Sequence, residues 1–232
     1  MKLILIRHGQ SVENAVPDGP EDPDSPLSEI GCEQARITAQ FLRETAPDAV
    51  ALYASPMQRA LQTADYVRAA LSLTPRILPA ICEAGGPKRP PGASSTEIMR
   101  NWPYVTLEET VTPSGWWTAT ESSADEDATF FRALRVADLF LSRHQQEAGP
   151  VIAVTHGRFG SAFVSALLGV CPRGYSRFPF DNCGLTRVDF DPRDSVAFAP
   201  PRSTGKGTVG HACAIRLRYH NRTDHLPATH IT

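Results

Sequence analysis

The sequence has no long apolar run and little net charge, and each absence excludes a class of protein. No uninterrupted apolar stretch approaches the roughly 20 residues that cross a bilayer, so we do not expect a membrane partner. The formal net charge of -2 leaves no basic surface for nucleic acid or for an anionic membrane. A site for a small anion would therefore need a local cluster of positive charge.

Cysteine is also scarce, and the N-terminal apolar segment is short. The five cysteines are odd in number, scattered, and form no C-x-x-C pair. This usage is typical of free thiols in a reducing compartment and not of a disulfide framework or a zinc site. Arg7 interrupts the first apolar segment before it reaches the roughly 7–15 residues of a secretory signal. These observations predict a cytoplasmic protein with no bound metal.

What the chain does contain is an alternation of strand-like and helix-like segments. Short apolar runs bounded by turn residues predict buried strands, and spacing of three and four residues predicts the helices between them. This order indicates the α/β class, as a three-layer α/β/α sandwich around a mainly parallel sheet with an antiparallel edge strand. The expected strands are residues 2–6, 49–55, 76–81, 150–156, 184–190, 195–199 and 212–220. The expected helices are residues 28–45, 56–71, 126–148 and 158–168.

Residues 84–125 differ in composition from the rest of the chain. They hold all three tryptophans, several Gly-Pro combinations and many serines and threonines. A long segment with weak periodicity inside a compact domain is usually a functional lid or an insertion. The sequence therefore predicts one domain over residues 1–232, with 84–125 as its lid or cap. Lys88, Arg89 and Arg100 in this segment either bind a polyanionic substrate or face water.

Polar side chains stand where four of the predicted strands end. In open α/β sheets, ligands bind beyond the carboxyl ends of the strands. The residues at these ends are Arg7 and His8, Arg59, Glu83, and His156. Two histidines, two arginines and one carboxyl group are thus expected to meet at one edge of the sheet.

Such a set suits the transfer of a phosphoryl group. Arginine presents a planar, permanently charged fork that matches phosphate oxygens. A neutral imidazole can attack phosphorus, and a second one, if protonated, adds positive charge. A carboxyl group that is held protonated can donate to a leaving alkoxide. Because side chains neutralise the transferring group, this chemistry needs no divalent metal.

At these positions the sequence resembles the histidine phosphatase superfamily, the phosphoglycerate-mutase-like enzymes. The order and spacing of four motifs agree over roughly residues 1–85 and 126–190. The similar segments are IRHGQSVEN (6–14), LSEIGCEQA (27–35), SPMQRALQTA (55–64) and VTHG (154–157). One R-H-G tripeptide would be weak evidence, but four motifs in order, each at or next to a predicted element boundary, are specific.

The resemblance implies a role for each matching residue. His8 would attack phosphorus and become transiently phosphorylated, with His156 as a second catalytic residue. The phosphoryl oxygens would be bound by Arg7, Arg59, His156, the Asn14 side chain and the backbone N–H of Gly157.

Glu83 is the expected proton donor, because it follows the third extended segment. It would protonate the leaving group and later activate water. The flanking residues Ile-Cys-Glu-Ala-Gly-Gly depart from the commoner family pattern, and Glu97 and Glu121 are the competing carboxyl groups.

The resemblance implies a metal-independent, histidine acid-type phosphatase that hydrolyses a small-molecule phosphate ester without a cofactor. A phosphoglycerate-type phosphomutase shares the chemistry up to the phosphoenzyme. Mutases resembling this family usually carry a charged Asn-Glu-Arg-type segment around the acid, which residues 81–85 lack. A non-catalytic binding module on the same fold is the third alternative. Neither the particular ester nor the oligomeric state is predicted.

Overall fold

The computed structural model describes residues 1–16, 24–88, 90–117, 125–170, 178–191 and 214–232. The strands are β1 (Lys2–Arg7), β2 (Ala51–Ala54), β3 (Pro75–Ile77), β4 (Thr106–Leu107), β5 (Pro150–Thr155), β6 (Leu185–Asp191) and β7 (Ala214–Arg222). The helices are α1 (Val12–Ala15), α2 (Glu29–Thr45), α3 (Gln58–Leu71), α4 (Ser95–Asn101), α5 (Glu126–His144) and α6 (Gly157–Leu167). Short 3-10 turns cover Pro79–Ile81 and Ala228–His230. The strand predicted at 195–199 lies outside the described residues.

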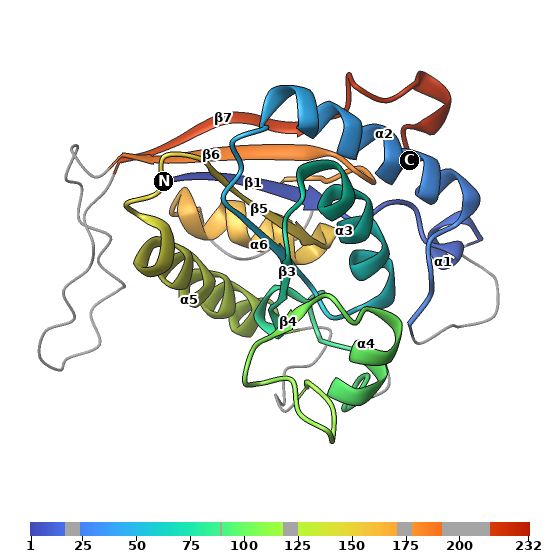
Figure 1. Ribbon diagram of the computed structural model, residues 1–232. Coiled ribbons are helices and arrows are strands. Elements are labelled where there is room, and N and C mark those ends of the chain that lie inside the picture. Colours follow the sequence, from blue (N-terminus) through green and yellow to red (C-terminus); the bar gives the residue numbers. More distant parts are fainter. Residues whose placement is uncertain (17–23, 89, 118–124, 171–177, 192–213) are drawn as a thin grey trace, which may run out of the picture.

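The strands form one mixed sheet of seven, in the order β4-β3-β2-β5-β1-β6-β7 (Figure 1). The five strands from β4 to β1 are parallel, β6 is antiparallel to β1, and β7 is antiparallel to β6. The predicted α/β class with a mainly parallel sheet and an antiparallel edge is therefore confirmed. The edge consists of two strands where the sequence predicted one.

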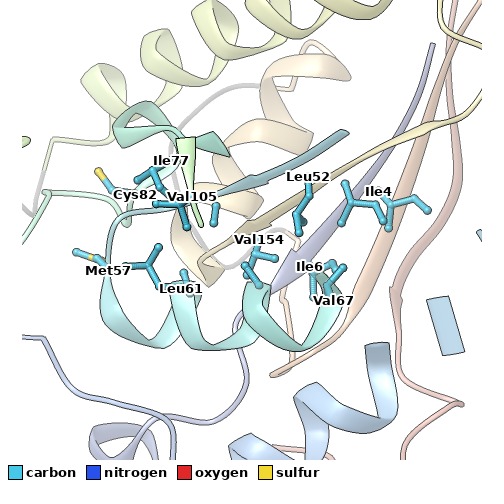
Figure 2. Packing of buried hydrophobic residues seen from close by; sticks show 14 of the residues in the cluster. Ile4, Ile6, Leu52, Met57, Leu61, Val67, Ile77, Cys82, Val105 and Val154 are labelled. Atoms are coloured by element: carbon cyan, nitrogen blue, oxygen red, sulfur yellow. The ribbon is translucent and has the colours of Figure 1, made fainter. Parts of the chain in front are cut away.

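Helices cover both faces of the sheet, because alternate strand residues point to opposite sides. On one face Leu3, Leu5 and Tyr53 pack in a cluster with residues of α5 and α6. On the other face Ile4 and Leu52 pack in a cluster with residues of α2 and α3, as Figure 2 shows for α3. Burial of each of the four leucine and isoleucine side chains among them contributes about 1.5–3 kcal/mol. The two cores hold the central strands, and with them the strand ends, in fixed positions.

The segment after Glu83 is more regular than its composition predicts. It forms α4 and then β4, which pairs with β3 as an edge strand of the sheet. Trp116 and Trp117 are buried against this edge. A Cβ atom at Gly86 would lie 2.2 Å from the Trp117 ring, so the chain there requires glycine. The segment is thus packed on the domain, and its role as a lid stays a prediction.

None of the helices in the described ranges combines the length and the apolar character that crossing a bilayer requires.

Candidate active site

The register of the central strands brings the two predicted histidines together. Arg7 at the end of β1 lies opposite Thr155 at the end of β5, so His8 and His156 leave the sheet at the same level. Their ring centroids are 5.0 Å apart. Both side chains are buried, at 3% and 0% exposure. The R-H-G motif and the T-H-G motif therefore meet in space, as predicted. Their catalytic roles stay predictions.

The backbone fixes which nitrogen of His8 carries the proton. Its Nδ1 lies 2.7 Å from the carbonyl oxygen of Gly9. A carbonyl only accepts, so Nδ1 must be the donor, and Nε2 keeps its lone pair. Arg59 Nε donates to this same Nε2 over 3.1 Å, which agrees with an unprotonated Nε2. His8 therefore presents Nε2 as a nucleophile with a cation beside it.

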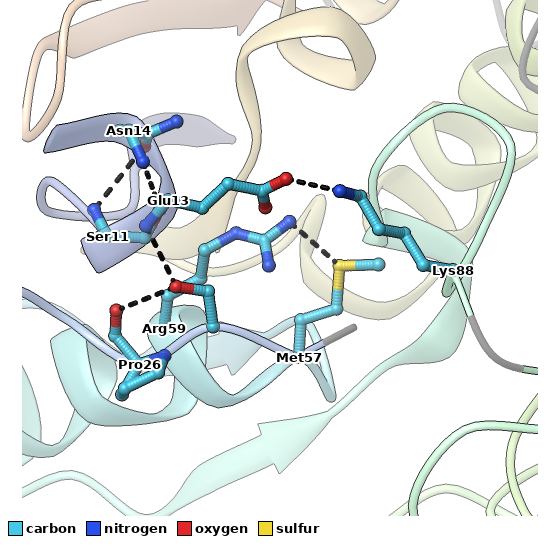
Figure 3. Close-up of polar contacts among 8 residues, drawn as sticks. Ser11, Glu13, Asn14, Pro26, Met57, Arg59 and Lys88 are labelled. Carbon is cyan, nitrogen blue, oxygen red and sulfur yellow. Dashed lines mark hydrogen bonds and ion pairs between the residues drawn. The ribbon is translucent and has the colours of Figure 1, made fainter. Parts of the chain in front are cut away.

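Arg59 reaches His8 from the first turn of α3. Its Nη2 donates to the Met57 sulfur over 3.3 Å (Figure 3). Thr63, one turn further along α3, accepts the N–H of Gly9 over 3.0 Å and donates to the Arg59 carbonyl over 2.7 Å. One helix thus positions both the guanidinium group and the loop that follows the nucleophile.

Two buried nitrogens at this cluster have no hydrogen-bond partner among the described residues, Arg7 Nε and His156 Nδ1. Arg7 uses Nη1 to donate to the Phe180 carbonyl over 2.6 Å, and His156 uses Nε2 in a 2.8 Å hydrogen bond with the Ser55 hydroxyl. Buried polar groups are nearly always paired in native proteins. Unpaired nitrogens on two residues of one cluster are consistent with a site that receives a polar ligand.

Gly157 is the first residue of α6 and borders Arg7. A Cβ atom at this position would lie 3.5 Å from Arg7 Nε, so the backbone of Gly157 faces the guanidinium group. The first N–H groups of a helix have no partner inside the helix and favour anions. The predicted donor thus lies next to the two histidines.

The Glu83 carboxylate sits at the start of the same helix. Its Oε1 accepts the N–H of Ala84 over 2.7 Å and of Phe159 over 3.0 Å, and its Oε2 accepts the N–H of Arg158 over 3.4 Å. Buried Arg132 donates to the carbonyl of Glu83 over 3.2 Å. Backbone N–H groups therefore hold the carboxylate at the amino end of α6, whose N-cap is His156, and Arg132 fixes the Glu83 backbone.

Of the two competing carboxyl groups, the one that the structure describes is not at the cluster. The exposed Glu97 carboxylate accepts both the N–H and the hydroxyl of Ser94 at 2.7 Å and thereby caps its own helix, α4. Glu121 lies outside the described residues. Among the described candidates, Glu83 alone is placed next to the histidines.

Asn14 is linked to the nucleophile through Asn182. Asn14 Oδ1 accepts from the N–H of Ser11 and from Asn182 Nδ2, both at 3.4 Å. Asn182 Nδ2 also donates to the His8 carbonyl over 2.9 Å. Because Asn14 Oδ1 faces these donors, its NH₂ group points away from them. These hydrogen bonds link Asn14 to the His8 backbone, and its role as a phosphate donor stays a prediction.

Burial and neighbouring cations keep both imidazoles neutral. Burial first, and then the charges of Arg59 and Arg7, hold the pKa of His8 well below its usual 6.5. Burial, Arg59, His8 and Arg7, in that order of importance, do the same to the pKa of His156. The positive charge of the cluster therefore comes from the arginines. The sequence allowed for a protonated second histidine, and the surroundings of His156 disfavour that form.

This electrostatic arrangement predicts that acid destabilises the fold. In the unfolded chain a histidine takes a proton below about pH 6.5, whereas buried His156 stays neutral, so the unfolded state is favoured as pH falls. Each such histidine lowers the free energy of unfolding by about 1.4 kcal/mol for each pH unit below the pKa of the unfolded chain. In urea unfolding at about pH 7, 6 and 5, we expect the free energy of unfolding of His156→Gln to fall less than that of the wild type, by about half that amount between pH 7 and 6 and by nearly all of it between pH 6 and 5. Equal slopes for the variant and the wild type would contradict a neutral His156.

Four residues that support the site were not given roles from the sequence. Ser55 and Thr63 lie within a quoted motif, and Ser55 directly follows a strand end, so the positional rule could have found it. Arg132 and Asn182 come from an α5 turn and a loop before β6. The segment Glu121-Ser122 with Arg132 resembles the family but gives Arg132 no role, and no sequence signal marks Asn182, because tertiary contacts bring these two residues to Glu83 and His8.

Comparison with known proteins agrees with this geometry. The model of the histidine phosphatase superfamily, branch 1, matches residues 3–198. A probable phosphoglycerate mutase, GpmB, of Yersinia pestis is 27% identical over 199 residues, which cover 82% of this chain and 85% of that protein.

Solved structures share the fold. A mycobacterial glucosyl-3-phosphoglycerate phosphatase, solved with VO₃, has a TM-score of 0.63 at 18% identity and covers 96% of this chain and 99% of its own. A phosphoserine phosphatase of Entamoeba histolytica, solved in complex with 3-phosphoglyceric acid, has a TM-score of 0.61 at 22% identity and covers 97% and 99%. The family match extends over most of the sequence, including every motif at the cluster. The chain belongs to branch 1 of the histidine phosphatase superfamily.

Proposed function

We propose that this protein is a metal-independent phosphomonoesterase that hydrolyses a small-molecule phosphate ester through a phosphohistidine on His8. The observation that carries the proposal is the state of His8. Its Nδ1 proton is engaged by the Gly9 carbonyl, and its unprotonated Nε2 accepts a hydrogen bond from Arg59 Nε, which a phosphoryl oxygen takes over when the ester binds. A neutral imidazole that is oriented for attack can form a bond to phosphorus. The adjacent cation offsets the negative charge of the phosphoryl group, and an exposed imidazole lacks both the orientation and the cation.

In the first step, His8 Nε2 forms a bond to phosphorus while the bond to the ester oxygen breaks. Glu83 enters this step in its protonated form and donates that proton to the leaving oxygen, which departs as an alcohol and leaves Glu83 as a carboxylate. Arg7, Arg59 and the backbone N–H of Gly157 meet the charge on the three phosphoryl oxygens, because guanidinium groups and helix N-termini bind such oxygens. His156 Nδ1 and Arg7 Nε, which have no partner among the described residues, would then form hydrogen bonds with phosphoryl oxygens.

In the second step, water attacks the phosphorus of the phosphohistidine. The Glu83 carboxylate takes a proton from this water, and the bond between phosphorus and Nε2 breaks. Inorganic phosphate and neutral His8 result, so the cycle closes without a metal or a redox partner. The Asn14 amide, oriented by Asn182, donates to a phosphoryl oxygen in both steps.

A phosphomutase is the second candidate, since a relative is named a probable phosphoglycerate mutase. It would use the same first step and then return the phosphoryl group to the substrate. The products separate the two functions. We expect inorganic phosphate from p-nitrophenyl phosphate at a rate unchanged by EDTA, and an acid-labile, alkali-stable phosphoryl group on His8.

Interconversion of 3- and 2-phosphoglycerate, followed by phosphorus NMR, at a rate comparable to phosphate release would favour the mutase instead. Binding of phosphate esters with neither product, and with no phosphoryl group on His8, would indicate a non-catalytic binding module.

A further inference from the structure

The edge strand β7 carries a bulge opposite the start of β6. Between two regular pairs of this ladder, His220 and Asn221 of β7 face the single residue Thr186 of β6. The backbone of Asn221 is left-handed, with φ at 49°, a conformation that asparagine tolerates better than most residues. Its N–H donates to the Thr186 hydroxyl over 3.1 Å, so the group that leaves the ladder keeps a partner. A bulge turns a side chain out of the regular strand direction, and here that side chain is Asn221.

The Asn221 amide binds both the backbone and the side chain of Asp181. Its Oδ1 accepts the N–H of Asp181 over 2.7 Å, and its Nδ2 donates to Asp181 Oδ2 over 2.8 Å. Gly184 packs against the same amide, since a Cβ atom there would lie 2.2 Å from Asn221 Oδ1. Gly184 also donates its N–H to the Asp181 carbonyl over 2.9 Å. One side chain of β7 thus fixes where the Asp181 carboxylate points.

The peptide unit between Phe180 and Asp181 joins this amide to the candidate active site. Its N–H belongs to Asp181 and donates to Asn221, and its carbonyl belongs to Phe180 and accepts from Arg7 Nη1 over 2.6 Å. Burial lowers the pKa of Arg7, and the charges of Glu83 and Asp181 act in the opposite direction, as carboxylates near a cation do. The Asp181 carboxylate is therefore attached close to the Arg7 guanidinium group.

Arg7 and Asp181, which both lie in the described part of the chain, nevertheless form no ion pair with each other. Asp181 Oδ2 is turned to Asn221, and Arg7 Nε has no hydrogen-bond partner among the described residues. A guanidinium group binds a carboxylate through two parallel hydrogen bonds, as it binds a phosphate. A buried donor without a partner favours any acceptor within reach. A released Asp181 carboxylate would therefore compete with a phosphoryl group for Arg7.

We propose that Asn221 is a positioning residue, which keeps the Asp181 carboxylate off Arg7 and so leaves Arg7 free to bind a phosphoryl group. This inference rests on the proposed function for one point, namely that Arg7 binds phosphoryl oxygens. Asn221 acts through Asp181 and belongs to a strand that carries none of the four motifs. The antiparallel edge of the sheet thereby controls the affinity of a site built at the ends of parallel strands.

Two substitutions of Asn221 release the carboxylate in different ways. Asn221→Gly removes the amide and keeps the left-handed backbone, which glycine adopts without strain. Asn221→Asp keeps the shape and the acceptor Oδ1, and sets a like charge against Asp181. Each should weaken the binding of inorganic phosphate, measured by calorimetry, about tenfold, because a charge pair on a partly buried arginine must first be broken. Gln145→Glu adds the same charge at the carboxyl end of α5 and should leave the affinity unchanged.

Replacing the competing carboxylate separates this role from a merely structural one. The Asp181→Asn side chain can still accept from Asn221 Nδ2, and it has no charge with which to hold Arg7. In this background, Asn221→Gly and Asn221→Asp should each change the affinity for phosphate by less than about twofold, since the interaction between the two sites is gone. A tenfold loss that persists in the Asp181→Asn background would mean that Asn221 only supports the loop, and it overturns the inference.

A crystal structure of Asn221→Gly supplies a readout that does not involve phosphate. We expect the Asp181 carboxylate within hydrogen-bond distance of Arg7, and a carboxylate that stays away from Arg7 contradicts the inference. If circular dichroism shows Asn221→Gly unfolded, the affinity and the crystal structure of the isosteric Asn221→Asp decide in its place. A wild type that binds phosphate but hydrolyses no ester would contradict the proposed function alone, because the affinities still decide the role of Asn221.

Discussion

Replacing His8 with alanine is expected to lower kcat for phosphate-ester hydrolysis by about 10³- to 10⁶-fold, the range for loss of a covalent nucleophile. Alanine offers no lone pair to phosphorus, the Ser55 and Thr63 hydroxyls are engaged in hydrogen bonds, and the hydrogen bond from His156 Nε2 to Ser55 holds the second imidazole in place. Phosphate release from p-nitrophenyl phosphate measures kcat. Labelled ester, quenched in alkali, should leave a phosphoryl group on the wild type and none on the variant.

A matched control is His230→Ala. The His230 ring contacts the Thr229 hydroxyl at 3.1 Å near the end of the chain, and alanine keeps the carbonyl that Gln34 uses. This control should retain wild-type turnover, and circular dichroism should show both variants folded. Full turnover by a folded His8→Ala would mean that phosphorus is attacked by another group or directly by water.

Glu83→Gln is expected to produce the second largest effect, and one that depends on the leaving group. An alkoxide is a poor leaving group without a proton, and general acid catalysis contributes about 10²- to 10⁴-fold. p-Nitrophenolate is stable enough to leave unprotonated. In single-turnover phosphorylation of His8, we therefore expect a loss of about that size for an alkyl phosphate and less than about tenfold for p-nitrophenyl phosphate.

The structure supplies a control for this prediction in Glu97→Gln. Glutamine can still accept from Ser94 and cap α4, so this variant should phosphorylate His8 at the wild-type rate with both esters. An equal loss for the two esters in Glu83→Gln would assign Glu83 a positioning role at the α6 N-terminus. A loss in Glu97→Gln would point to a donor from the segment around α4.

The strand ends could be predicted from sequence because buried parallel strands have a clear pattern. The apolar runs before Arg7 and Thr155 are short and continuous, and each is followed by a His-Gly pair after one residue. Once both are strands of one parallel sheet, the rule for ligand positions brings His8 and His156 together. The rule does not say where along the sheet edge the two residues lie. The register of β1 against β5 shows that both leave the sheet at the same level.

Other features could not be predicted, for physical reasons that differ. β4 is two residues long, too short for any periodicity to show. The capping box of α4 is present as Ser94 and Glu97, but the surrounding glycines and prolines conceal a seven-residue helix. Asn182 is buried by contacts with residues far away in sequence, and no local pattern encodes such contacts.

The position of β1 in the sheet has a consequence for biosynthesis. β1 lies between β5 and β6, and Lys2 pairs with Pro150 on one side and with Asp189 on the other. The ribosome therefore releases an apolar strand with two open edges long before either neighbour has been translated. Pairing across such separations slows folding, and open edges invite aggregation. The nascent polypeptide is expected to need shelter from a chaperone until its second half emerges.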